Sequence, residues 1–352
     1  LYRPGPMQFI PNFINRKHGK EEVEYPHELL EPILNYSYGI MVYQEQIMQT
    51  AQILAGYSLG GADLLRRAMG KKDMKKMAEE REKFIAGAAE IHKIPAKKAS
   101  EVFDVMEKFA QYGFNRSHSA AYSVVAYQTG YLKAHYPAEY MAAVLTNNMN
   151  DIKKVTFFIE EARKQGVEVL GPDVNESLLK FNVNDQGQIR FGLGAIKGTG
   201  EAAVEAIISE REKNGLYQDI FDFAKRINLR AVNKKTFESM ALAGCFDSWE
   251  LYHRAQLIEI PEGESMSVLE KAVRYGNSWQ AEQQAAQQSL FGGGAAVAAP
   301  LPKIPEVPVW TQAEMLRREK EVVGFYMSGH PLDQFKLEID SYCTCALSNI
   351  EE

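Results

Sequence analysis

The stretch Gly113-Phe-Asn-Arg-Ser-His-Ser-Ala-Ala-Tyr-Ser-Val-Val-Ala-Tyr127 indicates the start of a long helix, and the rest of the chain is organised around it. Asn115, Ser117 or Ser119 can cap this helix, because a short side-chain oxygen accepts hydrogen bonds from the free N–H groups of the first turn. From Ser119 onward the residues are small or apolar. This pattern predicts a helix over residues 119–136 that packs closely against its neighbours.

Two cationic side chains, Arg116 and His118, lie at the beginning of this helix. The helix dipole is positive there, so a cation is unfavourable unless an anion binds beside it. A helix N-terminus is also a common phosphate-binding site. From these residues alone, two interpretations stay open: a capped helix that needs no ligand, or an anion site.

Length and composition indicate a globular protein of two or three domains, because the chain has 352 residues, of which 45% are hydrophobic. No run of about 18 apolar residues predicts a transmembrane span. The chain begins with Leu and has no signal peptide, so we expect it to be cut from a longer protein. Its three cysteines form neither a disulfide framework nor a zinc site, which favours the reducing cytoplasm.

The charge is unevenly distributed along the chain. The net charge of −6 argues weakly against a general nucleic-acid binder. However, residues 1–136 contain 18 Lys and Arg against 15 Asp and Glu, whereas residues 137–352 contain 22 against 31. The first third therefore has the better case for an anionic partner.

The hydrophobic periodicity predicts a mainly α-helical fold with a small β element. An ordered loop over residues 1–26 is followed by predicted helices over residues 28–34, 42–54, 58–69, 75–92, 95–111, 119–136, 137–147 and 152–165, with Gly70 just beyond the third of them. Strand-like alternation covers residues 167–170, 180–184 and 188–191, around a turn at 185–187. Short helices follow over residues 199–212, 220–227 and 233–242.

Composition then divides the chain into four parts. We predict a multi-helix domain over residues 1–166 and a β element with helical hairpins over residues 167–250. Residues 251–308 are predicted to be a linker, because they become Gln/Ala-rich, Gly-rich and finally Pro-rich. Residues 309–352 form a C-terminal segment that starts with a charged helix over residues 313–322.

A dense basic run covers residues 66–76, where six Lys and Arg are interrupted by one acid. Arg66 and Arg67 lie near the end of one predicted helix, and Lys71 and Lys72 follow it. One interpretation is a solvated surface. The other is a phosphate pocket, in which Arg binds as a bidentate fork and Lys as a point charge.

The sequence Lys197-Gly198-Thr199-Gly200, between an apolar stretch and an amphipathic helix, is typical of a helix-hairpin-helix. The glycines allow backbone N–H groups to reach a phosphate oxygen. Such hairpins bind the duplex backbone without reading base sequence. A second hairpin-like half over residues 227–247 offers Arg230, Lys234 and Lys235 near a helix start. The alternative is a pair of purely structural hairpins, which nearby acids favour for part of the surface.

A third motif, Gln287-Gln-Ser289-Leu290-Phe291, lies in the predicted linker. A short peptide of this kind can dock its Leu and Phe side chains into an apolar groove. The alternative is a chance apolar pair.

Together these stretches resemble the fingers of the alpha subunit of bacterial DNA polymerase III, a C-family replicative polymerase. The resemblance is carried by residues 1–7, 38–46, 65–72, 114–122, 131–141 and 325–332, and it covers essentially the whole chain. It implies that the two hairpins form the tandem helix-hairpin-helix that holds duplex DNA. It also implies that residues 287–291 are the peptide that binds the sliding clamp (the beta subunit), and that residues 325–332 precede an OB domain.

The resemblance further implies a pocket for the incoming deoxynucleoside triphosphate. Its candidate residues for triphosphate contact are Arg66, Arg67, Lys71, Lys72, Arg116 and His118, with Ser117, Ser119 and Tyr122 lining the pocket and Tyr43 and Gln44 in support. We therefore expect Arg116 or His118 to face the same cleft as Arg66 or Arg67.

The resemblance also implies what this chain lacks. The palm carboxylates that hold the metal ions of the family are absent, so we expect no catalytic residues, no metal and no cofactor here, with Mg²⁺ needed by the full polymerase. The implied partners are primer-template DNA, deoxynucleoside triphosphates, the clamp and other replisome subunits, with no membrane. The fragment alone is predicted to be inactive. A rival interpretation is a DNA- and clamp-binding module with no nucleotide site.

Overall fold

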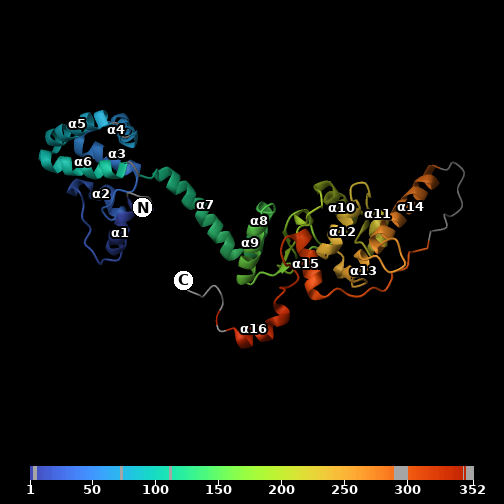
Figure 1. Cartoon of the computed structure of the whole chain (residues 1–352). Coiled ribbons are helices and arrows are strands. Elements are labelled where there is room, and N and C mark those ends of the chain that lie inside the picture. The colour runs from blue at the N-terminus through green and yellow to red at the C-terminus, as the bar shows by residue number, and fades with distance from the viewer. Residues whose placement is uncertain (3–5, 72–73, 111–112, 289–299, 344, 346–352) are drawn as a thin grey trace. The chain divides into compact units, whose positions relative to one another are not determined.

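The computed structural model in Figure 1 describes the chain except for residues 3–5, 72–73, 111–112, 289–299, 344 and 346–352, and it leaves the side chains of residues 71, 110 and 286–288 undescribed. Two compact units are present, Leu1–Gln128 and Thr129–Glu352, called here the first unit and the second unit. The division falls within helix α7 (Arg116–His135).

The first unit is built from helices around α3. Its elements are the 3-10 helices η1 (Pro6–Phe9), η2 (Glu28–Leu30) and η3 (Asn35–Ser37) and the helices α1 (Ile10–Lys17), α2 (Glu31–Leu34), α3 (Gln44–Ala55), α4 (Leu59–Lys71), α5 (Met74–His92) and α6 (Ala96–Ala110). Ile47 and Leu54 of α3 are buried in the core. Helix α5 approaches α3 closely because Gly87 has no side chain: a Cβ there would lie 2.4 Å from the Ala55 carbonyl oxygen.

Two helix boundaries in the first unit differ from those predicted. Helix α4 continues through Gly70 to Lys71, so Gly70 does not terminate it. Helix α7 begins at Arg116, because Asn115 caps it by accepting a 2.8 Å hydrogen bond from the His118 N–H. Every residue of α7 is described and none is buried, so the prediction of close packing along this helix is wrong. Small side chains allow close packing but do not require it.

The second unit combines helices with a three-stranded sheet. Its helices are α8 (Pro137–Asn147), α9 (Ile152–Lys164), α10 (Glu201–Asn214), α11 (Ile220–Arg226), α12 (Lys234–Ala243), α13 (Arg254–Ile258), α14 (Val268–Gln288), α15 (Gln312–Val323) and α16 (Lys336–Tyr342), with 3-10 helices η4 (Leu193–Ala195), η5 (Asp247–Trp249) and η6 (Asp333–Phe335). Strands β1 (Val169–Leu170), β2 (Asn182–Val183) and β3 (Ile189–Arg190) have the order β1-β3-β2. β3 pairs parallel with β1 and antiparallel with β2. The predicted mainly α fold with a small β element is confirmed.

Packing places α8 and α9 with the second unit, not with the helices that precede them. Met141 and Leu145 of α8 and Ile159 of α9 belong to the same buried core as Val169 and Ile189 of the sheet. The boundary between the two compact units therefore lies within α7. The predicted boundary at residue 166 was based on the first strand-like pattern in the sequence. The apolar faces of α8 and α9 need the sheet as their partner.

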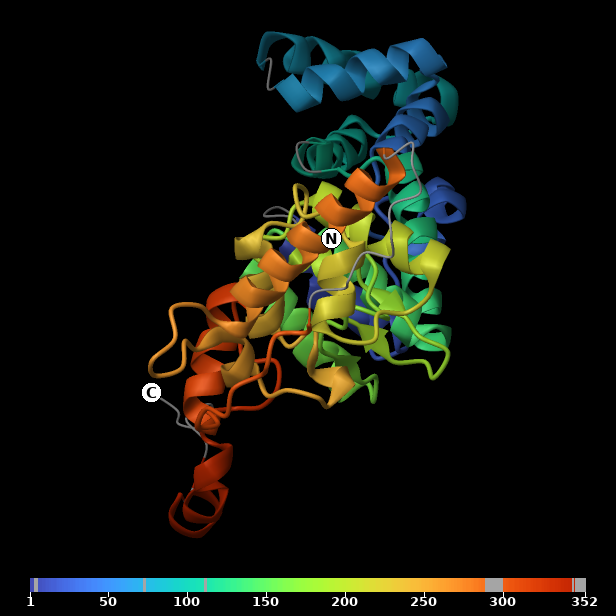
Figure 2. The same ribbon diagram turned by 90° about the vertical axis from the view of Figure 1, so that its right-hand side faces the viewer.

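The prediction of a linker over residues 251–308 is wrong for residues 254–258 and 268–288, which form α13 and α14. Helix α14 lies along α11, as Figures 1 and 2 show. Leu269 and Ala272 are fully buried, and one turn further a Cβ on Gly276 would lie 2.3 Å from the Ala224 carbonyl oxygen. This stripe of apolar and small residues at helical spacing is a local signal that the Gln/Ala composition obscured.

Helix α15 is joined to the rest of the second unit by a buried ion pair. Glu319, which is 0% exposed, lies 3.0 Å from the Arg254 guanidinium, which also binds Asp247 at 2.7 Å. Glu319 Oε1 accepts hydrogen bonds from the N–H groups of Met327 and Ser328 at 2.6 and 2.9 Å. One carboxylate therefore holds the segment that follows α15 against it. Among the described residues, no helix is long and apolar enough to cross a membrane.

Candidate nucleotide and DNA sites

The start of α3 contacts two of the predicted nucleotide residues, Arg66 and Arg116. Tyr43 forms a parallel β-bridge with Phe114. The Gln44 N–H donates to the Phe114 carbonyl oxygen, and the Phe114 N–H donates to the Val42 carbonyl oxygen, each at 3.0 Å. Gly113 is buried against Gln44, where a Cβ would lie 3.1 Å from Cγ. The segment before α7 is thereby anchored to α3.

Arg66 reaches the same place from α4. Its Nη1 donates to Gln44 Oε1 at 3.1 Å, and its Nε and Nη2 donate to Asp63 Oδ1 at 3.0 and 2.7 Å. Arg67 pairs with the other oxygen of Asp63 at 2.8 Å and keeps 64% of its side chain exposed. The hydrogen bond from Arg66 is the main reason that the pKa of Asp63 is lowered. Both arginines are therefore held in place on one carboxylate.

The anion position at the beginning of α7 is filled by a side chain of α3. The Arg116 N–H donates to both carboxylate oxygens of Glu45, at 3.0 and 3.1 Å. The Arg116 guanidinium lies 4.7 Å from the ring centroid of Tyr36 and 6.0 Å from that of Tyr43. An acid thus compensates the dipole at this helix start, and two aromatic rings orient the guanidinium.

The remaining predicted residues lie along α7 or outside the described part. The His118 ring lies between Phe114 and Tyr122 and is tilted against both, with ring centroids 5.4 and 4.4 Å away. Ser117 is exposed, and Ser119 lines a cavity of about 300 Å³ together with Tyr43. Lys72 lies outside the described residues, and the side chain of Lys71 is not described.

Three residues of this site were missed from the sequence. Asp63 precedes Arg66 and Arg67 by three and four residues, a helical spacing that favours ion pairs, so the sequence did carry its signal. Glu45 and Tyr36 contact Arg116 across 71 and 80 residues. No local pattern indicates such contacts.

The two glycines of the first hairpin differ in backbone conformation, because Gly200 has an ordinary φ of −82°. Gly198 has a φ of +92°, and a Cβ there would lie 3.0 Å from Ser239 Oγ on α12. Within the described part of the chain, the N–H groups of Gly198 and Gly200 donate to no partner. The Lys197 N–H is occupied, because it donates to the Val322 carbonyl oxygen at 2.9 Å, but the Lys197 side chain is exposed.

The cationic side chains of the second hairpin differ in how far they are already paired with acids. Lys234 lies 2.7 Å from Glu270 and 3.6 Å from Glu238, and the hydrogen bond to Glu270 raises the pKa of Lys234. Lys235 and Arg230 are exposed and form no ion pair with the described residues. Lys235 is also near the first hairpin, since its Cε lies 3.9 Å from the Cβ position of Gly198. The available cations are therefore Lys197, Arg230 and Lys235.

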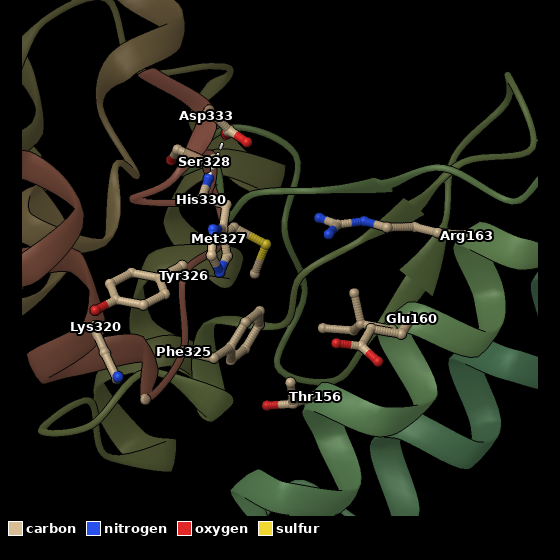
Figure 3. Close-up of a pocket in the computed structure, with 13 residues that line it drawn as sticks. Thr156, Glu160, Arg163, Lys320, Phe325, Tyr326, Met327, Ser328, His330 and Asp333 are labelled. Atoms are coloured by element: carbon tan, nitrogen blue, oxygen red, sulfur yellow. Dashed lines mark hydrogen bonds between the residues drawn. The ribbon is translucent and has the colours of Figure 1, made fainter. Parts of the chain in front are cut away.

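A cavity of about 690 Å³ lies between α9 and the segment that follows α15, and Figure 3 shows the residues that line it. Ile159, Phe325 and Met327 give it an apolar lining, and Arg163 reaches toward it from α9. Lys320 Nζ lies 4.4 Å from the ring centroid of Tyr326. The cavity thus combines aromatic side chains with charged groups of both signs, at a place where the sequence predicted no binding site.

The predicted clamp-binding peptide is described only at its beginning. Gln287 lies in the last turn of α14, and its side chain is not described. Ser289, Leu290 and Phe291 lie outside the described residues.

Comparison with known proteins first defines the class of protein. Residues 1–92 match the family described as the bacterial DNA polymerase III alpha subunit finger domain, and residues 166–257 match the helix-hairpin-helix motif. The chain therefore combines a polymerase finger domain with a helix-hairpin-helix module.

Relatives then identify the family. DNA polymerase III subunit alpha of Vibrio cholerae is 46% identical over 360 residues, covering 99% of this chain and 30% of the relative. The same subunit of Escherichia coli K12 is 45% identical over 97% of this chain, and that of Neisseria meningitidis 45% over 100%. The chain belongs to the bacterial DNA polymerase III alpha subunit family and spans about 30% of the length of these relatives. The resemblance seen in the sequence is confirmed.

Proposed function

We propose that this chain provides the nucleotide-positioning and DNA-holding surfaces of a DNA-directed DNA polymerase, a nucleotidyltransferase. The observation that carries the nucleotide site is the meeting of two distant basic stretches at the first turn of α3. Arg66 binds Gln44, and the N–H of Arg116 binds the neighbouring Glu45. A triphosphate is a polyanion, and positioning it and neutralising its charge are the main contributions a protein makes to phosphoryl-type transfer.

Three guanidinium groups at this site would exchange their present protein partners for phosphate oxygens. Arg66 and Arg67 are oriented by Asp63, and Arg116 is oriented by two tyrosine rings. Phosphate oxygens would replace the carboxylate of Asp63 in the bidentate geometry that Arg favours. Lys71, the last residue of α4, would add charge, as would Lys72, which lies outside the described residues, while Ser117, His118, Ser119 and Tyr122 would form the wall that α7 contributes.

The metal chemistry of such a polymerase is not assigned to this chain. Its described residues contain no group of three His, Cys, Asp or Glu side chains that could hold a metal ion. The Mg²⁺ expected for a complete polymerase therefore does not fit them, and we derive no step through it. We expect no template-directed extension by the chain alone.

The two hairpins are proposed to hold duplex DNA by its backbone. The N–H groups of Gly198 and Gly200, which have no partner among the described residues, would donate to a phosphate. Thr199 shapes the turn through its hydroxyl group, which donates to the Leu193 carbonyl oxygen at 2.7 Å. Lys197, Arg230 and Lys235 add cations, with Lys234 weakened by its two glutamates. Their contacts carry no base preference.

The nucleotide site is tested by Arg66→Ala combined with Arg67→Ala in a complete alpha subunit that carries this segment. We expect the KM for nucleotide to rise about tenfold or more, the scale of lost charge-assisted hydrogen bonds, while DNA affinity is kept. Arg317→Ala, which removes an exposed, paired arginine of α15, is the matched control and should leave KM unchanged.

A second candidate function is a DNA- and clamp-binding module with no nucleotide site. It is favoured by the acids already present, because Asp63 neutralises two arginines and Glu45 compensates the start of α7. Under this proposal the double variant weakens DNA binding on all sequences and reduces its salt dependence. Asp63→Asn separates the two cases further: it lowers the nucleotide KM only if the freed arginines bind triphosphate.

The clamp contact is proposed for residues 287–291, of which the first two are the last two residues of α14. Leu290→Ala combined with Phe291→Ala should abolish measurable binding to a sliding clamp, because two apolar anchors are lost. Unchanged clamp affinity would reject this assignment without affecting the other two sites.

A further inference from the structure

A groove of about 640 Å³ lies between the turn of the second hairpin and one face of α14. Residues 225–230 line one side, and residues 277, 279–281, 283 and 284 line the other. None of these described lining residues is Asp or Glu, although the chain contains 46 acids and has a net charge of −6. The lining of the groove is therefore positive on a protein that is acidic overall.

Five of the polar side chains that line this groove are not used within the described part of the fold. The side chains of Lys225, Arg230, Asn277, Gln283 and Gln284 form no hydrogen bond or ion pair with the described part of the chain. These five side chains supply two cations and three amides. Each amide both donates and accepts, so the groove can bind anions and the polar edges of a base.

Trp279 is the aromatic residue of this groove, and its indole differs from the other two. Trp249 Nε1 donates to the Tyr217 carbonyl oxygen at 3.0 Å, and Trp310 Nε1 donates to Glu259 at 2.9 Å. The Trp279 indole N–H has no hydrogen-bond partner among the described residues, and its side chain is half-buried. A large ring with an unused donor is thus held in the same groove as Arg230.

The walls of the groove are fixed by contacts behind it. Gln280 Nε2 donates to the carbonyl oxygens of Lys225 and Ile227 at 3.0 and 2.8 Å, which ties α14 to the end of α11. Arg226 is occupied by Glu210 and Asp222, each at 3.0 Å. Rigid walls lower the entropy lost when a ligand binds.

We infer that this groove binds an unpaired nucleotide of single-stranded DNA, with the base against Trp279 and the phosphate near Arg230 and Lys225. Aromatic rings beside cations are the usual means of binding single strands, because every base has a face on which an aromatic ring stacks. A base inside a duplex is covered by its neighbours and cannot reach Trp279. The volume is within the range of small-ligand sites.

The other large cavity of the second unit is less suited to this ligand. Glu160 and Asp333 line it, and Lys320 already lies over the Tyr326 ring. The groove beside α14 shares only Arg230 with the proposed duplex surface. Its single-strand binding therefore does not depend on whether the hairpins bind duplex DNA.

The experiment measures the anisotropy of a labelled oligothymidylate and, separately, of a labelled blunt duplex with the full chain. Trp279→Ala should weaken single-strand binding about tenfold, and Trp279→Phe should retain it because a phenyl ring still stacks. Ser278→Ala is the matched control, because Ser278 is the exposed neighbour of Trp279 on α14 and does not line the groove. Duplex affinity should be the same for all four proteins.

A double variant and a thermal unfolding control complete the test of the groove. Gln283→Glu combined with Gln284→Glu places acids in the groove and should weaken single-strand binding most at low salt. Equal loss of single-strand and duplex affinity in Trp279→Ala, or no loss of either, overturns the proposal. Absence of duplex binding in every protein counts against the hairpin assignment alone. Thermal unfolding of each variant confirms that it folds.

Discussion

Replacing Glu319 by Gln tests whether one buried carboxylate organises the C-terminal part of the second unit. Glu319 Oε1 accepts from two backbone N–H groups, and Oε2 accepts from the Arg254 guanidinium at 3.0 Å. A glutamine can keep its oxygen on the two N–H groups. Its NH₂ group then faces the guanidinium, so that two donors oppose each other.

The expected loss in the free energy of unfolding follows from the interactions that the substitution removes and from those that it keeps. The charge-assisted hydrogen bond from Arg254 is lost, which costs about 2 kcal/mol. Asp247 remains 2.7 Å from Arg254, so the guanidinium is not left unpaired and the larger cost of an isolated buried charge is avoided. For a unit of this size, about 2 kcal/mol corresponds to a decrease in Tm of roughly 4–8 °C.

Thermal unfolding of the full chain provides the assay, because the first unit shares no residue with the ion pair and serves as an internal reference. The matched control is Glu321→Gln, which removes an exposed ion pair with Arg317 on the same helix and should cost well under about 1 kcal/mol. If Glu319→Gln shifts the Tm of the second unit no more than Glu321→Gln does, the buried carboxylate does not organise this segment.

Three further predictions concern single residues. Gly198→Ala should destabilise the second unit by about 1–2 kcal/mol, because a residue with a Cβ is strained at a φ of +92°, whereas Gly200→Ala, at −82° with open space around it, should cost less in the same thermal unfolding measurement. The pKa of Glu314 is lowered to about 2, first by its hydrogen bond from Arg317. Because the folded pKa lies below the unfolded value, its contribution to stability is present above pH 4.5 and disappears as the pH falls toward 2, which NMR titration of the carboxyl group would show. Burial raises the pKa of the Cys245 thiol, so thiol reagents should label the two exposed cysteines at neutral pH and reach Cys245 only on unfolding.

Local signals in the sequence were sufficient for most of the secondary structure. Asn115 could be recognised as a cap from its side-chain chemistry, although Ser117 and Ser119 offered the same chemistry. Gly198 could be recognised as a tight-turn residue, and its φ of +92° agrees. Helix α14 was not predicted, because its Gln/Ala-rich composition favours a linker. The apolar and small residues that recur along it at helical spacing favour a helix. Gly276 shows how α14 lies on α11, a contact that periodicity alone does not reveal.

The candidate site likewise has features that the sequence indicates and contacts that only the structure shows. The sequence by itself determined the mainly helical fold, the membership of the polymerase family and the location of the charged stretches. It could do so because helix propensity, capping and motif identity are properties of short stretches. Only the tertiary structure decided which groups meet. It placed Glu45 at the start of α7, joined Arg66 to Gln44 and set Trp279 in one groove with Arg230. These partners are distant in sequence, so their contacts depend on how the helices pack.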